Sequence, residues 1–72
     1  MDEKKFLEKI SDIVEEEEGT ITFATELDAL EAWDSLARIT FLVFAADEFK
    51  KRVDGNLVKE AKTVSDLYQL VL

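Results

Sequence analysis

The segment EAWDSLARITFLVF, residues 31–44, holds the side chains best placed for chemistry in this chain of 72 residues. Ser35 carries a hydroxyl group, and Asp34 beside it carries a carboxylate. A serine nucleophile needs a general base, and the chain has no histidine to act as one. It also has no cysteine, so thiol catalysis and thiolate metal sites are excluded. We therefore expect no enzyme activity and no metal site, and an autonomous serine hydrolase is disfavoured.

The position of Ser35 suits a different chemistry. Asp34 and Ser35 are typical first residues of a helix, and an apolar run follows them. The start of a helix offers N–H groups and the positive end of the helix dipole, so a phosphate attached to a serine there is stabilised. From these residues alone, Ser35 is either a solvated capping residue or the attachment point of a phosphodiester.

Four helices are predicted to position this serine. Apolar residues recur at helical spacing in the first segment and predict a helix over 2–17, with Gly19 supplying a left-handed residue just past its end. The glutamates at 15–18 oppose the helix dipole, so we expect fraying there. Residues 20–33 show no lasting period and predict a long ordered loop with a short helical turn near 26–31.

A second helix is predicted from Asp34 and Ser35 to the basic run at 50–52, which favours a helix C-terminus. Its main apolar stripe is predicted to comprise Leu36, Ile39, Val43, Ala46 and Phe49. Two further phenylalanines, Phe41 and Phe44, fall outside that stripe, so we expect the helix to be covered on several sides.

After the second helix, the sequence predicts a turn at residues 54–56 and a short helix at Leu57–Ala61. A final helix is predicted to begin at Thr63, with Asp66 as the capping-box partner of Thr63. The apolar face of that final helix is predicted to contain Val64, Leu67, Leu70 and Val71. The expected fold is all-α: a single domain over residues 1–72, built as a small four-helix bundle with a long ordered loop and a short third helix.

Charge limits the partners that this domain can bind. The net charge of the chain is −8, which disfavours nucleic acid as a partner. When the chain is divided into four consecutive segments, only residues 36–52 have a positive net charge, which is +2. The chain starts with charged residues and has no apolar run long enough for a membrane span. We expect a soluble, cytoplasmic protein, monomeric and not bound to membranes.

The sequence resembles an acyl carrier protein over essentially its whole length. The resemblance rests on the helix order, the long loop, the DSL tripeptide at residues 34–36, Phe49 near the end of the second helix, and the final TVSDLYQLV. It implies that a phosphopantetheinyl transferase attaches 4′-phosphopantetheine from coenzyme A to Ser35. The thiol of that arm would carry an acyl group as a thioester between acyl-loading and acyl-processing enzymes. It also implies that Asp34 assists the transferase and that partners dock on the second helix, at Leu36, Arg38, Val43 and Asp47.

Several residues depart from the family pattern. Ala37, Thr40 and Ala46 stand at positions that are commonly acidic, which should weaken electrostatic docking to fatty-acid-synthesis enzymes. Phe41 and Phe44 should narrow any acyl cavity. We therefore expect a specialised carrier of a fatty-acid, lipid or polyketide-type pathway.

Trp33 is expected to anchor the loop against helix ends. An aminoacyl or peptidyl carrier of the same fold is an alternative, although peptidyl carriers commonly place glycines before their serine. The other alternative is an unmodified helical interaction domain in which Ser35 is only a cap.

Overall fold

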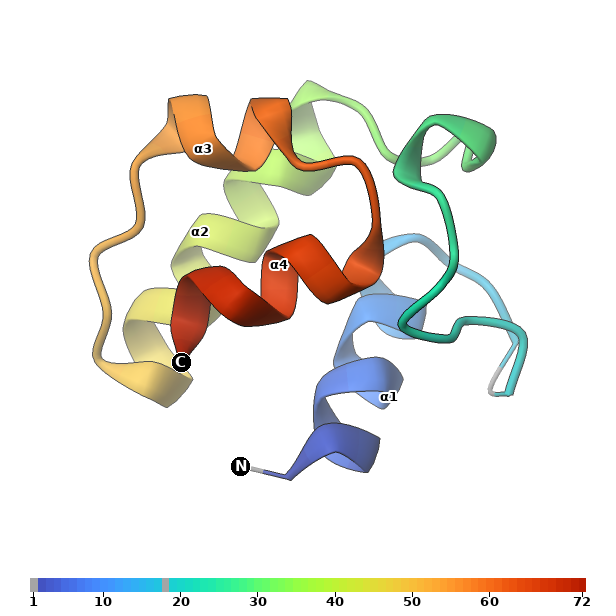
Figure 1. Ribbon diagram of the computed structural model, residues 1–72, viewed down its shortest axis with the longest axis horizontal. Helices are drawn as coiled ribbons and strands as arrows, with labels where there is room; N and C mark the ends of the chain where they lie inside the picture. Colours follow the sequence, from blue (N-terminus) through green and yellow to red (C-terminus); the bar gives the residue numbers. More distant parts are fainter. Residues whose placement is uncertain (1, 18) are drawn as a thin grey trace.

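The computed structural model describes residues 2–17 and 19–72. Four α-helices and one short 3₁₀ turn follow one another along the described chain: α1 Glu3–Ile13, η1 Leu27–Ala29, α2 Ser35–Phe49, α3 Gly55–Glu60 and α4 Val64–Val71. Figure 1 shows the long connection between α1 and α2 running along one side of the bundle before it reaches the start of α2. The small all-helical bundle, its long loop and its short third helix are thus as predicted.

Helix α1 is shorter than predicted, and the expected role of Gly19 is wrong. The main-chain N–H of Lys5 donates to the Asp2 carboxylate at 2.8 Å, which caps the start of the helix. The helix ends at Ile13 because Glu15 adopts a left-handed conformation with φ 56°, and the N–H of Glu16 then bonds a carbonyl oxygen of the last turn. Negative charge disfavours a helix C-terminus, and Glu15 accordingly lies in the turn that follows the helix. Gly19, with φ 90°, lies several residues further on, and position 18 is outside the described residues.

An aromatic cluster forms the centre of the core. The Phe6 side chain is fully buried on α1, and its ring centroid lies 4.8–6.3 Å from five other rings. These rings come from the long loop, α2 and α4: Phe23, Phe41, Phe44, Phe49 and Tyr68. Edge-to-face pairs of this kind add about 0.5–1.5 kcal/mol beyond the burial of area. One phenylalanine therefore ties three parts of the chain together.

Most of the predicted apolar stripe of α2 is exposed, although Phe49 at its end packs against the core. Leu36, Ile39 and Val43 are 70%, 57% and 56% exposed, whereas Phe41 and Phe44 are 0% and 4% exposed. The sequence did not indicate which side of α2 is buried, because the helix is apolar on nearly every side and spacing alone cannot choose between two apolar faces. Phe41 and Phe44 are the side chains that face α1, where their rings pack against Phe6.

The long loop is held against the start of α4, as an ordered loop requires. The N–H of Leu27 donates to the carbonyl oxygen of Lys62 at 2.8 Å, and the N–H of Val64 donates to that of Thr25 at 3.0 Å. Leu27 and Ile21 are both buried in the core. The predicted short helical turn is confirmed at η1, and these bonds fix the path by which the loop approaches α2.

Local capping residues determine where the last two helices begin. The Asp54 carboxylate accepts the N–H of Asn56 at 2.8 Å, so α3 begins at Gly55, two residues before its predicted start. Thr63 and Asp66 form the predicted capping box at the start of α4. The N–H groups of Lys62 and Thr63 both donate to the Asp66 carboxylate, and these bonds hold the pKa of Asp66 below its ordinary value.

Candidate functional site

Ser35 is the first residue of α2, and its side chain is exposed. Asp34 precedes it in an extended conformation and caps the helix, since its Oδ1 accepts the N–H of Ala37 at 2.9 Å. An aspartate cap satisfies one of the N–H groups that a helix start leaves without a helical partner. The capped first turn therefore presents the Ser35 hydroxyl to solvent on a fixed backbone.

Arg38 brings a positive charge to this hydroxyl. Its Nη2 atom donates a hydrogen bond to Ser35 Oγ at 3.1 Å, one turn along the helix. A guanidinium group and the positive end of the helix dipole thus act on the same oxygen. Both favour a phosphate at this oxygen, so the residues present suit a serine-linked phosphodiester. Sequence reasoning missed this contact, although the i, i+3 spacing of the two residues on a helix was the signal that could have found it.

The four predicted docking residues divide between two sides of α2. Leu36, Val43 and Asp47 are exposed and lie seven and four residues apart, which places them on one face of the helix. Arg38 lies two residues from Leu36, on another side, and is only half-exposed. The structure therefore groups Arg38 with Ser35 and leaves the other three as a separate exposed face.

A hollow of about 300 Å³ lies beside Ser35, where it is lined by both neighbouring residues. It lies between the C-terminal end of α1, the end of the loop and the first turns of α2, and its walls include Ile13, Asp34 and Leu36. Polar and apolar side chains share these walls. The surface beside Ser35 is therefore concave and of mixed polarity.

Trp33 holds the loop in place immediately before the site. Its indole is half-buried and packs edge-on against Phe41, with ring centroids 6.3 Å apart. The N–H of Trp33 also donates to the carbonyl oxygen of Leu30 at 3.1 Å. The predicted anchoring role of Trp33 is confirmed, and it fixes the direction from which the chain enters α2.

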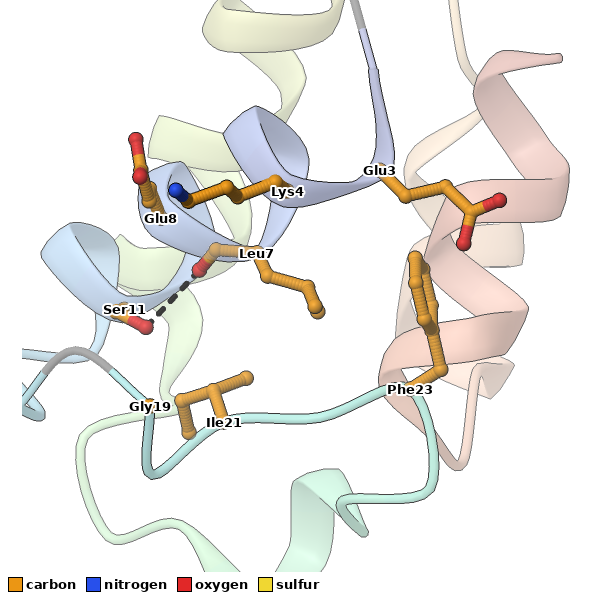
Figure 2. Close-up of a pocket in the computed structure, with 8 residues that line it drawn as sticks. All are labelled: Glu3, Lys4, Leu7, Glu8, Ser11, Gly19, Ile21 and Phe23. Carbon is orange, nitrogen blue, oxygen red and sulfur yellow. Dashed lines mark hydrogen bonds between the residues drawn. The ribbon is translucent and has the colours of Figure 1, made fainter.

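A separate groove of about 470 Å³ lies between α1 and the loop. Figure 2 shows Leu7, Ile21 and Phe23 around it, with the Ser11 hydroxyl donating to the carbonyl oxygen of Leu7 at 2.9 Å. None of the residues lining this groove belongs to α2. It is therefore not part of the site at Ser35, and the space between α1 and α2 is filled by phenylalanine rings.

Searches against family models, curated proteins and solved structures found no match for this chain. Within residues 2–17 and 19–72, no group of three or more acidic side chains is placed to hold a metal ion. Over the same residues, no helix is long and apolar enough to span a membrane.

Proposed function

We propose that this protein is an acyl carrier whose Ser35 receives 4′-phosphopantetheine from coenzyme A. The observation that carries the proposal is the exposed Ser35 hydroxyl on a capped helix start, with the Arg38 guanidinium 3.1 Å from its oxygen. The resemblance of the DSL motif and its surroundings to acyl carrier proteins supplies the identity of the group.

The attachment step requires little chemistry from this chain. The Ser35 oxygen bonds to the phosphorus next to pantetheine, the phosphoanhydride bond of coenzyme A breaks, and adenosine 3′,5′-bisphosphate leaves. The serine proton passes to a base on the transferase, because the carrier has no histidine to accept it. Exposure of Ser35 allows the transferase to reach the oxygen while the helix keeps it in position.

Asp34 and Arg38 have different roles in this proposal. Asp34 fixes the first turn through its bond to the N–H of Ala37, and its exposed carboxylate faces the approaching transferase. Arg38 compensates the negative charge of the new phosphodiester. The attached arm supplies a thiol that holds the acyl group, and tethering raises the effective concentration of the thioester in a partner's active site.

The partners that we propose are the transferase and enzymes that load or process the acyl group. The exposed face with Leu36, Val43 and Asp47 begins next to Ser35 and is a surface on which they can dock. Thr40 and Ala46 occupy exposed positions where this family commonly has acids. A specialised fatty-acid, lipid or polyketide-type pathway therefore suits this carrier better than primary fatty-acid synthesis.

The interior of the bundle also favours a specialised cargo. Phe41 and Phe44 are buried against Phe6, where an acyl chain inside the bundle would need space. A long chain would have to displace these rings or remain outside them. An aminoacyl load, which is short and polar, requires no such space, so an aminoacyl carrier is the second candidate.

Intact mass after incubation with coenzyme A and a broad-specificity phosphopantetheinyl transferase tests the proposal. Wild type should gain one phosphopantetheine, and Ser35→Ala should gain none. Ser65→Ala is the matched control, because Ser65 also lies in the first turn of a capped helix but is half-buried. This variant should be modified like wild type. No gain in wild type, under conditions that modify a known carrier, would favour the unmodified interaction domain.

A further inference from the structure

An exposed apolar ridge runs along α2 away from Ser35. Ile39, Val43 and Ala46 form this α2 ridge, and all three are exposed; Ile39 is 57% and Val43 56% exposed. Ile39 lies four residues from Ser35 and seven from Ala46, so these positions follow one side of the helix. Apolar side chains this exposed and this closely grouped are typical of an interaction surface.

The ridge ends at a basic hollow of about 420 Å³, which we define by all the residues that line it: Leu42, Ala46, Lys50, Lys51, Arg52 and Val53. Lys50 turns the chain out of the helix with φ 55°, and Lys51 bonds the main-chain oxygen of Leu72. Positive charge is favourable here because the last carbonyl groups of α2 carry partial negative charge. Ala46 belongs to both features, so the ridge and the hollow are continuous.

The charge of this surface is opposite to that of the rest of the molecule. Residues 36–52 carry a net charge of +2 in a chain whose net charge is −8. Within this stretch, Lys50, Lys51 and Arg52 place positive charge at the end of α2 that is farther from Ser35. Complementary charge orients partners during encounter and rejects those of the wrong sign. A strongly acidic protein also disfavours an anionic membrane as the occupant.

We propose that the α2 ridge and the basic hollow together form the docking surface for an enzyme that presents an apolar cleft ending in an acidic patch. The 15 residues of α2 place that patch about 22 Å from the opening that receives the arm on Ser35. The identification of this partner as an enzyme rests on the proposed carrier function, whereas the surface and its polarity do not. In this arrangement the carrier supplies the positive charge and the partner supplies the negative charge. This is the reverse of an arrangement in which a basic groove of the partner binds an acidic helix of the carrier.

Two designed peptides test this surface on the unmodified chain. Both are amphipathic helices with the same leucine face, and their polar positions are filled with glutamate in one and with lysine in the other. Titration of the ¹⁵N-labelled protein should show the glutamate peptide shifting amide signals of residues 39–53. The lysine peptide should leave those signals unchanged and should instead shift signals of the acidic residues 15–17, which follow α1.

Charge variants identify the part of the surface that selects the peptide. Lys50→Gln/Arg52→Gln should weaken binding of the glutamate peptide roughly fivefold or more. Lys4→Gln/Lys5→Gln is the matched control, because it removes the same net charge from exposed positions on α1. The control should change the affinity less than about twofold, since distant exposed charges are screened by salt.

Four results would overturn the proposal. The first is no shift of residues 39–53 at millimolar glutamate peptide, and the second is an equal response to the lysine peptide. The third is binding of the ridge to vesicles of anionic phospholipid, which would assign the surface to membranes. The fourth is concentration-dependent dimerisation lost in Val43→Ser, which would assign it to a second copy of the chain. Every one of these experiments uses unmodified protein, so their outcomes are independent of whether Ser35 accepts phosphopantetheine.

Discussion

Phe41 and Val43 are two residues apart in α2, yet their substitution by alanine should affect stability very differently. The Phe41 side chain is fully buried, and its ring contacts those of Phe6, Trp33 and Phe44. Val43 is 56% exposed on the α2 ridge. The pair therefore tests which face of α2 belongs to the core, a choice that determines the docking surface.

The expected magnitudes follow from burial. Removing a buried phenylalanine ring typically costs about 3–5 kcal/mol. A domain of 72 residues has a total free energy of unfolding of about 4–11 kcal/mol, so Phe41→Ala should remove a large fraction of it. Val43→Ala removes the equivalent of two buried methylene groups, worth about 0.8 kcal/mol each at full burial. Partial exposure halves that loss, and the higher helix propensity of alanine offsets up to about 0.7 kcal/mol.

Urea titration followed by circular dichroism measures both free energies of unfolding. Phe41→Ala should lose at least about 3 kcal/mol, corresponding to a fall in Tm of about 12 °C or more in a domain of this size. Val43→Ala should stay within about 0.5 kcal/mol of wild type. Equal losses in the two variants, or a larger loss in Val43→Ala, would refute the observed orientation of α2.

Three further perturbations test local features of the fold. Asp34→Ala removes the cap of α2 and should cost about 1 kcal/mol, and an unchanged thermal midpoint would contradict the capping role. Glu15→Gly should raise the thermal midpoint by relieving a left-handed residue at φ 56°, with a gain of up to about 1 kcal/mol; a fall would show that the turn does not strain this residue. The pKa of Asp66 is lowered from 3.8 by N–H donors of Lys62 and Thr63, so its contribution to stability is full above pH 3.8 and is lost as the pH falls through the lowered pKa. Asp66→Asn should therefore lower the urea midpoint near neutral pH but much less in strong acid, and an equal deficit at both pH values would contradict this account.

The sequence predicted those parts of the fold that depend on local signals. The capping box of Thr63 and Asp66, the start of α2 after Asp34 and the short turn in the long loop each follow from residues close together in the chain. The end of α1 was misplaced because apolar spacing continues to Val14, whereas the turn at Glu15 depends on backbone conformation.

The rotation of α2 could not be predicted from spacing, because it is decided by contacts between distant segments. Phe41 and Phe44 are buried because Phe6 of α1 lies opposite them. The same rotation exposes Val43, which sequence reasoning divided between core and docking. At the site, the position of Ser35 at the helix start was predictable, while the bond from Arg38 to its hydroxyl required the helix geometry to be considered.

The most direct test of the carrier proposal is a thiol titration of the protein after incubation with coenzyme A and a phosphopantetheinyl transferase, followed by removal of small molecules. The chain has no cysteine, so every thiol detected on the purified protein must come from an attached arm. We predict one thiol per chain in wild type and none in Ser35→Ala. The absence of thiol in both proteins, under conditions that modify a known carrier, would contradict the central claim, and an equal thiol content in both would show that Ser35 is not the attachment site.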